Sequence, residues 1–302
     1  MRAPPSPFPG RLTPIGRVAC EIPHREFLQK LAVAAGSVVA ASHILTTLGF
    51  DGGLVEEARA QELPFEESAG QYAMSDRMVD YFLARPAASG TSPGMIVIHE
   101  NVGLSDFARN VARKLARRGA VALAPNVLPF AAVSADGRHA PWMLETLRTG
   151  VAAVPEDEID ALNAGYDWLA AQPGVDADHI GAVGFCWGGA RSFTLATRNQ
   201  RLWAAVVFYG STPPFDTLPN ITAPVLALYG ALDNNSATSI TGRAAETARE
   251  MRRINKTFEW EVYNQAPHAF FRAADQSVSQ SRAATAAWDL MIDFLARNWI
   301  RR

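Results

Sequence analysis

A cysteine flanked by glycines is the residue of this chain best placed for chemistry. Residues Gly184–Gly188 read Gly-Phe-Cys-Trp-Gly and follow an apolar run that begins at Ile180. This is the pattern of a nucleophile elbow, a sharp turn that joins a strand directly to a helix and carries the nucleophile at its centre. Most such turns carry serine, and Cys186 takes its place here. The flanking glycines are needed because side chains there would collide with the neighbouring strand and helix.

An elbow would activate Cys186 through its position. Its sulfur would lie at a helix N-terminus, where free N–H groups and the helix dipole favour a thiolate. The alternative is a tight turn around a buried, inert cysteine, because free cysteine is among the most buried residue types. The presence or absence of catalytic partners decides between the two.

The later part of the chain offers both partners that a nucleophile needs, a base and a group that orients the base. Asp233 follows the apolar run Val225–Gly230, and His268 follows the strand-like run Phe258–Tyr263. The order nucleophile, acid, histidine is that of elbow enzymes. Parallel strands end at one edge of a sheet, where ligands bind. We predict a triad of Cys186, Asp233 and His268; the alternatives are a helix-capping aspartate and a loop histidine.

Glu100 is a fourth candidate. It follows the apolar run Met95–Ile98, in the loop that supplies the second oxyanion N–H group of α/β-hydrolases. We expect the backbone N–H groups of Trp187 and Asn101 to form the oxyanion hole. The His99-Glu100 pair is not a zinc-protease motif, because the second histidine of that motif is missing. No other cluster has metal-ligand spacing, so we predict neither metal nor cofactor.

Alternating strand-like and helix-like segments predict the fold. The chain has 302 residues, of which 48% are hydrophobic and 19% charged, which is typical of a globular protein with a large core. Alternating β and α units form a mostly parallel sheet with helices on both faces. We therefore predict a single-domain α/β-hydrolase fold over residues 61–302. Residues 126–154 show no clear period and are expected to form a long loop or a lid over the site.

The expected elements can be placed by residue. Strands are predicted at Val79–Ala84, Met95–Ile98, Ala120–Ala124, Ile180–Phe185, Trp203–Tyr209, Val225–Gly230 and Phe258–Tyr263. Helices are predicted to begin at a Ser105 cap and at Pro155, and to cover Gly188–Arg198, Ser239–Met251 and Ala284–Arg297.

Residues 1–60 have the composition of an export leader rather than of the fold. The first residues are rich in proline and arginine and are expected to be disordered. A basic segment at Arg25, the apolar stretch Leu31–Phe50 and the small-x-small site Ala58–Ala60 together form an export signal. It resembles a twin-arginine signal with His24 in place of the first arginine. We predict a periplasmic protein cleaved at Ala60; a membrane anchor, an amphipathic helix and a cytoplasmic protein with a non-functional leader are the alternatives.

Charge and cysteine content narrow the class of partner. The formal net charge is −2 without a long run of either sign, so we expect neither a nucleic acid nor a stable membrane partner. Loss of the leader would remove Cys20 and leave Cys186 alone. A lone cysteine cannot form an internal disulfide in an oxidising compartment, which favours a reactive role for it.

From about Met78 to Arg302, the chain resembles the dienelactone hydrolase family, the carboxymethylenebutenolidases. The resemblance implies that Cys186, Asp233 and His268 form the triad, and that Glu100 holds the thiol until substrate arrives and then helps to generate the thiolate. The matching motifs are Val97–Asn101 with Gly103, Ala124-Pro125, Gly184–Gly189, Tyr229-Gly230 with Asp233, and His268–Phe270.

The resemblance also implies a substrate. An arginine shortly after the histidine binds the substrate carboxylate in that family, and Arg272 stands at this place; the alternative is a surface arginine. The family's second substrate arginine has no matching position, and Asn126 replaces the aspartate usual after Ala-Pro. We predict hydrolysis of a small ester or lactone through an acyl-cysteine. The alternatives are a general carboxylesterase or thioesterase acting on another acyl substrate, and an exported binding protein without catalysis.

Overall fold

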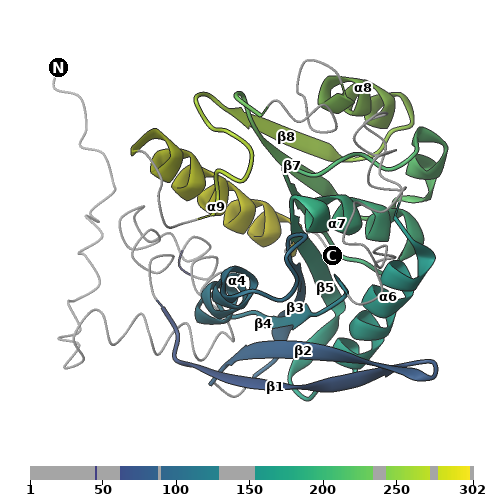
Figure 1. Ribbon diagram of the computed structural model, residues 1–302, viewed down its shortest axis with the longest axis vertical. Coiled ribbons are helices and arrows are strands. Elements are labelled where there is room, and N and C mark those ends of the chain that lie inside the picture. Colours follow the sequence, from purple (N-terminus) through teal and green to yellow (C-terminus); the bar gives the residue numbers. More distant parts are fainter. Residues whose placement is uncertain are drawn as a thin grey trace, which may run out of the picture.

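The computed structural model describes residues 45, 62–87, 90–128, 154–233, 243–272 and 278–299. These residues form an eight-stranded sheet with helices on both faces (Figure 1). The strand order is β1-β2-β4-β3-β5-β6-β7-β8. Strand β2 is antiparallel to its neighbours β1 and β4, and the remaining pairs are parallel. The predicted α/β-hydrolase fold with a mostly parallel sheet is confirmed.

The elements have the following bounds. The strands are β1 Phe65–Met74, β2 Arg77–Pro86, β3 Ser92–Ile98, β4 Val121–Pro125, β5 Val175–Phe185, β6 Ala205–Phe208, β7 Val225–Gly230 and β8 Phe258–Tyr263. The helices are α4 Asp106–Arg117, α6 Glu156–Ala170, α7 Trp187–Arg198, the 3-10 helix η2 Phe215–Asn220, α8 Ala245–Arg253 and α9 Val278–Trp299.

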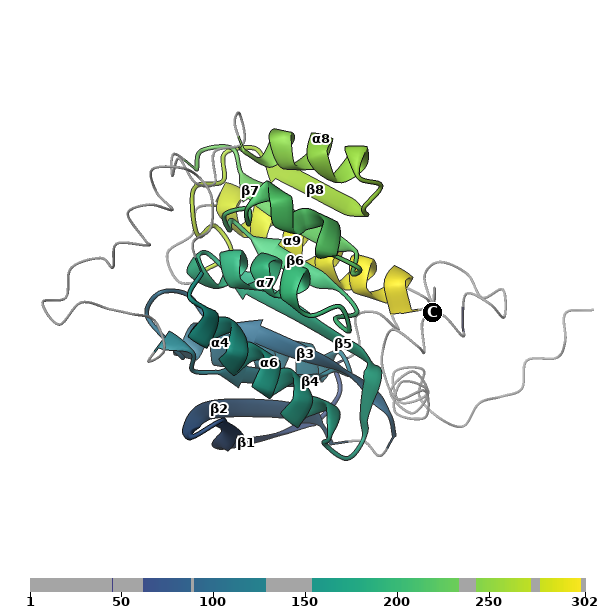
Figure 2. The ribbon, with the colours of Figure 1, turned by 90° about the vertical axis from the view of Figure 1, so that its right-hand side faces the viewer.

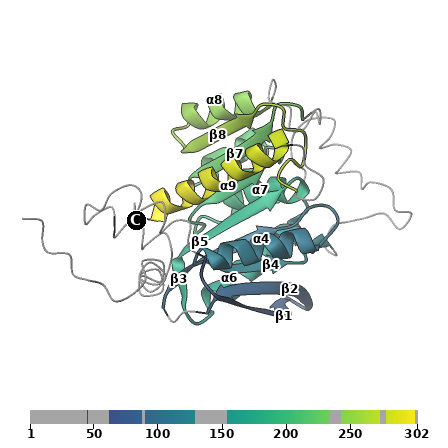
Figure 3. The same ribbon diagram turned by 90° about the vertical axis from the view of Figure 1, so that its left-hand side faces the viewer.

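Each face of the sheet has its own hydrophobic core. Helices α4 and α9 cover one face, and α6, α7 and α8 cover the other (Figures 1, 2 and 3). In α6, four apolar residues recur at helical spacing and are buried in the core between the sheet and helices α6, α7 and α8: Ile159, Leu162, Tyr166 and Leu169. Strands β3, β4 and β7 are buried along their length because helices cover both faces of the sheet.

Most predicted elements differ from the structure by a few residues at their ends, and one strand was missed. Strand β1 was not predicted, because it is an antiparallel edge strand whose polar side chains face solvent and whose burial is concentrated at Tyr72 and Met74. Ser105 occupies the N-cap of α4, but its side chain makes no capping hydrogen bond. The predicted helix start at Ser239 lies outside the described residues, which include α8 from Ala245. Helix α9 begins at Val278, earlier than predicted.

Two predicted segments lie outside the described residues. One is the export leader over residues 1–60, of which the structure describes only the buried Leu45. The other is residues 129–153, which make up most of the segment predicted to lie over the site. Within the described part of the chain, no helix combines the length and apolar character needed to cross a membrane.

Candidate active site

The predicted elbow has the backbone of a strained turn. Strand β5 ends at Phe185, α7 begins at Trp187, and Cys186 between them has φ 55° and ψ −113°. Such a conformation costs on the order of 1–3 kcal/mol in a residue with a side chain, and surrounding contacts must hold it. A methyl group on Gly184 would overlap the carbonyl group of Gly188, so the turn is too tight for any side chain there.

The three predicted triad residues meet at the carboxyl edge of the sheet. His268 Nε2 lies 3.0 Å from Cys186 Sγ, and His268 Nδ1 lies 2.8 Å from Asp233 Oδ2. The Asp233 side chain is fully buried, and that of His268 is 29% exposed. The residues arrive from β5, from the loop after β7 and from the loop after β8, as the sequence order predicted. The geometry is that of a nucleophile, a base and the group that orients the base.

Electrostatics place a proton on His268. Burial alone would lower the pKa of His268, but its hydrogen bonds to Asp233 and Cys186, together with their negative charge, raise it to about 10. The histidine is then charged at neutral pH, with Asp233 as acceptor on one side and the sulfur as acceptor on the other. The positive charge of His268 thus lies directly beside the Cys186 sulfur.

Glu100 lies nearby and faces Arg272. Its Oε2 atom is 3.6 Å from Arg272 Nη1 and accepts no hydrogen bond from the described residues. Burial raises the pKa of the Glu100 carboxyl group, and the charges of Arg272 and His268 offset part of this increase. The Arg272 side chain is 54% exposed, so a guanidinium group stands at the open side of the site with a buried carboxylate behind it.

The two expected oxyanion donors lie at the start of α7 and in the loop after β3. Trp187 is the first residue of α7, so its N–H group has no partner four residues earlier in the helix. Asn101 lies in a tight turn closed by a hydrogen bond from Gly103 N–H to the Glu100 carbonyl, 3.1 Å long. A methyl group on Gly188 would overlap the carbonyl groups of Ile98 and His99. The start of α7 is therefore in direct backbone contact with the end of β3 and the loop that follows it.

Tyr209 is a neighbour of the triad that sequence reasoning missed. It follows β6, has a positive φ of 41°, and packs edge-on against the His268 ring with 5.1 Å between centroids. Its hydroxyl is buried and without a hydrogen-bond partner among the described residues, and burial raises its pKa well above the ordinary value. The sequence did hold one signal for this contact: Tyr209 is an aromatic residue at the end of a predicted strand, on the edge where Cys186 and His268 lie.

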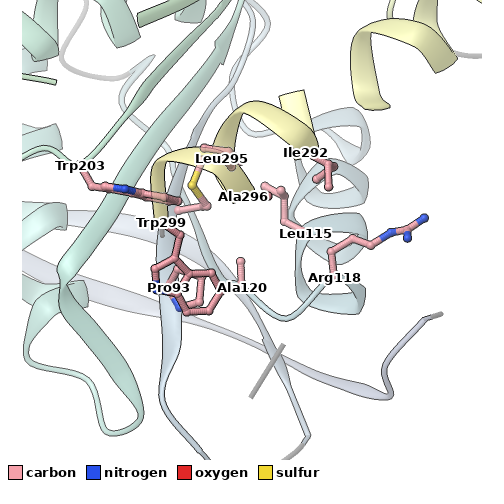
Figure 4. Close-up of a pocket in the computed structure, with 10 residues that line it drawn as sticks. Pro93, Leu115, Arg118, Ala120, Trp203, Ile292, Leu295, Ala296 and Trp299 are labelled. Carbon is pink, nitrogen blue, oxygen red and sulfur yellow. The ribbon is translucent and has the colours of Figure 1, made fainter. Parts of the chain in front are cut away.

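A separate cavity lies at the opposite edge of the sheet (Figure 4). Its walls include Pro93 and Met95 from β3, Trp203 from the loop before β6, and Trp299 from the end of α9. These walls are almost entirely apolar, and the catalytic residues are not among them. The described residues contain no group of three or more histidine, cysteine, aspartate or glutamate side chains arranged to hold a metal ion.

Comparison with known proteins agrees with this geometry. The sequence model of the dienelactone hydrolase family matches residues 79–298. A Salmonella typhimurium protein named "Putative carboxymethylenebutenolidase" is 33% identical over 237 residues, which cover 74% of this chain and 84% of that protein. A protein of the same name from Escherichia coli K12 is 33% identical over 235 residues, 74% of this chain and 83% of that one.

A solved structure extends the likeness to three dimensions. The crystal structure named "Putative Dienelactone Hydrolase", from Klebsiella pneumoniae, superposes with a TM-score of 0.65 at 28% identity, over 77% of this chain and 99% of its own. The family match covers well over half of the chain and includes every predicted triad residue. This chain therefore belongs to the dienelactone hydrolase family.

Proposed function

We propose that this hydrolase cleaves an ester or lactone through an acyl-cysteine on Cys186. The carrying observation is the 3.0 Å contact of Cys186 Sγ with His268 Nε2, with His268 held in turn by Asp233. The raised pKa of His268 keeps the proton on nitrogen, which leaves the sulfur free to attack. Membership of a family of ester and lactone hydrolases supports the reaction class.

The reaction divides into two steps of acyl transfer. The sulfur attacks the carbonyl carbon, and the negative oxygen is stabilised by the N–H groups of Trp187 and Asn101. The C–O bond then breaks, and His268 gives its proton to the leaving oxygen; in a lactone this oxygen stays attached to the acyl group. Water attacks the acyl-cysteine while His268 takes its proton. The second intermediate breaks its C–S bond, releases the acid and restores the starting pair.

Substitution of Cys186 tests the mechanism. Cys186→Ala should abolish hydrolysis of a small aryl ester, and a short incubation of the native enzyme with such an ester should add one acyl mass at this residue. Asp176→Asn, which alters a His–Asp pair at the far end of β5, serves as a matched control with normal activity. Full activity in Cys186→Ala would refute the cysteine mechanism.

The substrate class follows from Arg272 and Glu100. A guanidinium group binds a carboxylate through two parallel hydrogen bonds, so an acidic lactone or ester fits the open side of this site. Binding would draw Arg272 away from Glu100 and leave the buried carboxylate beside the sulfur, where it acts as the family resemblance implies. Carboxymethylenebutenolidase, the name of the Salmonella relative, denotes an enzyme for a carboxylate-bearing lactone.

A panel of acidic and neutral esters and lactones separates this proposal from a general carboxylesterase or thioesterase. Arg272→Ala should raise KM for the acidic substrates by about tenfold or more and leave neutral esters within about twofold. Equal effects on both groups would favour the general esterase. Rapid labelling of Cys186 by iodoacetamide would argue against a non-catalytic binding protein, whose buried thiol should react slowly.

We also propose export to the periplasm. The basic segment, apolar stretch and small-x-small site within residues 1–60 support it. Expression of the full chain, followed by cell fractionation and mass measurement of the mature protein, should give a periplasmic form that starts at Gln61. A full-length cytoplasmic product would refute export.

A further inference from the structure

The residues expected to form the oxyanion hole are packed against buried side chains that have no part in the proposed reaction. His99 and Arg191 both stack on Trp187, the residue after the nucleophile. The rings of His99 and Trp187 are almost parallel, with 6° between planes and 5.2 Å between centroids. Arg191 Cζ lies 3.7 Å from the Trp187 ring centroid. All three residues are at least nine-tenths buried, although two of them are titratable.

The hydrogen bonds of His99 determine its tautomer. The backbone N–H group of Val127 donates to His99 Nε2 over 3.1 Å, so this nitrogen must be an acceptor. The ring proton is therefore on Nδ1, which donates to the Glu100 carbonyl over 2.7 Å. Burial lowers the pKa of His99 to about 4, which keeps the ring neutral during turnover at neutral pH. His99 thus joins the loop after β3 to the loop after β4.

The carbonyl of Glu100 fixes the direction of an oxyanion donor. In a planar trans peptide, the C=O of one residue and the N–H of the next point in opposite directions. The Glu100 carbonyl is held by His99 and by Gly103 N–H, so the N–H of Asn101 is held pointing the other way. Any rotation of this peptide would turn the donor away from the oxyanion.

Arg191 contacts Trp187, the residue of the second expected oxyanion donor. Its Nη1 atom donates to the Trp187 carbonyl over 3.3 Å, and its Nε atom donates to Glu158 Oε2 over 2.6 Å. Glu158 comes from α6, which lies beside α7 on the same face of the sheet (Figure 1), and its side chain is fully buried. A buried ion pair needs good geometry to offset the loss of hydration, so it holds the start of α7 in a single position.

We propose that His99 and Arg191, with Glu158, are positioning residues that set the relative orientation of the Asn101 and Trp187 N–H groups. Trp187 connects them, because both stack on its ring. This inference rests on the proposed oxyanion chemistry and adds to it the residues that fix the donors. Removing a donor typically lowers kcat by about 10²- to 10³-fold, and misaligning one should have a smaller effect.

The test compares acyl transfer with alkylation of the same sulfur. Hydrolysis of an aryl ester passes through an oxyanion, whereas the reaction of Cys186 with iodoacetamide does not. His99→Phe keeps an aromatic ring but removes both hydrogen bonds. It should lower kcat by about 10- to 100-fold with little change in KM, and leave the alkylation rate within about twofold. His99→Gln can still donate and accept, and it should restore kcat to within about threefold of the native value.

A second variant tests Arg191 without leaving an unpaired buried charge. The double change Glu158→Leu with Arg191→Met replaces the ion pair by apolar side chains, which proteins often tolerate. It should lower kcat about tenfold at unchanged alkylation rate. Arg201→Met is the matched control, because Arg201 also stacks on an aromatic ring, Tyr166 at 4.6 Å, and pairs with Asp167 at 2.7 Å. This control should behave as the native enzyme.

Each outcome has one meaning. Native kcat in both His99→Phe and the double variant overturns the inference, and so does a parallel loss of hydrolysis and alkylation, which would mark a general structural role. Loss of hydrolysis with normal alkylation, restored by His99→Gln, supports it. Failure of the proposed cysteine mechanism would be recognised separately, by full activity in Cys186→Ala.

Discussion

Asp233→Asn is the substitution whose effect can be worked out furthest from the structure. Asparagine keeps the shape of the side chain and can still accept a hydrogen bond from His268 Nδ1, but it removes the negative charge at 2.8 Å. The pKa of His268 is raised from 6.5 to about 10 by Asp233 and Cys186 acting against burial. This net increase corresponds to roughly 5 kcal/mol. The two partners together supply more than that, because they also offset the effect of burial.

The pKa of His268 should therefore fall by at least about one pH unit in Asp233→Asn, or about 1.4 kcal/mol. An NMR titration of the His268 Cε1–H signal measures it directly. In serine triads the same change lowers kcat about 10⁴-fold. A thiol depends less on its histidine than a hydroxyl does, so we expect a fall of about 10²- to 10³-fold in ester hydrolysis. The control is Asp176→Asn, in which His179 loses a similar partner.

The same substitution has a predictable effect on stability. A histidine whose pKa is higher in the folded than in the unfolded state stabilises the fold fully below pH 6.5, and this contribution is lost as pH rises through about 10. Thermal unfolding of the native protein should become easier across this window, and the slope should be smaller in Asp233→Asn. An unchanged His268 titration together with native kcat would refute the reasoning.

Two further changes test the elbow and the buried carboxylate. Gly188→Ala should destabilise the fold by about 3 kcal/mol or more and lower activity, because the new methyl group would overlap the carbonyl groups of Ile98 and His99. Thermal unfolding measures the loss of stability, and ester hydrolysis measures the loss of activity. A native melting temperature would contradict the prediction. Glu100→Gln should gain stability relative to the native chain as pH rises from 4.5 to the folded-state pKa of Glu100. Burial raises this pKa, so ionisation of Glu100 costs the native fold stability over this range. Melting curves at pH 4 and pH 7 check this, and equal differences at both values would contradict it.

The sequence by itself determined the class of fold and predicted the three residues that meet at the carboxyl edge of the sheet. Glycine spacing around Cys186 and a late Asp233 and His268, each after an apolar run, were enough because parallel strands all end at one edge of the sheet. Strands β7 and β8 match their predicted bounds because apolar or β-branched runs bounded by turns are local signals. Strand β1 lacks such a run and was missed.

The tertiary structure alone decided how these residues are oriented and what surrounds them. Sequence spacing could not show that Glu100 faces Arg272, or that Tyr209 packs on His268, because these contacts join separate loops. It also could not distinguish Arg191 from a surface arginine on α7. Its burial depends on Glu158, 33 residues earlier, whose carboxylate offsets the cost of placing a charge in the core. Local patterns identify the groups that react, whereas packing between distant segments sets their directions and charges.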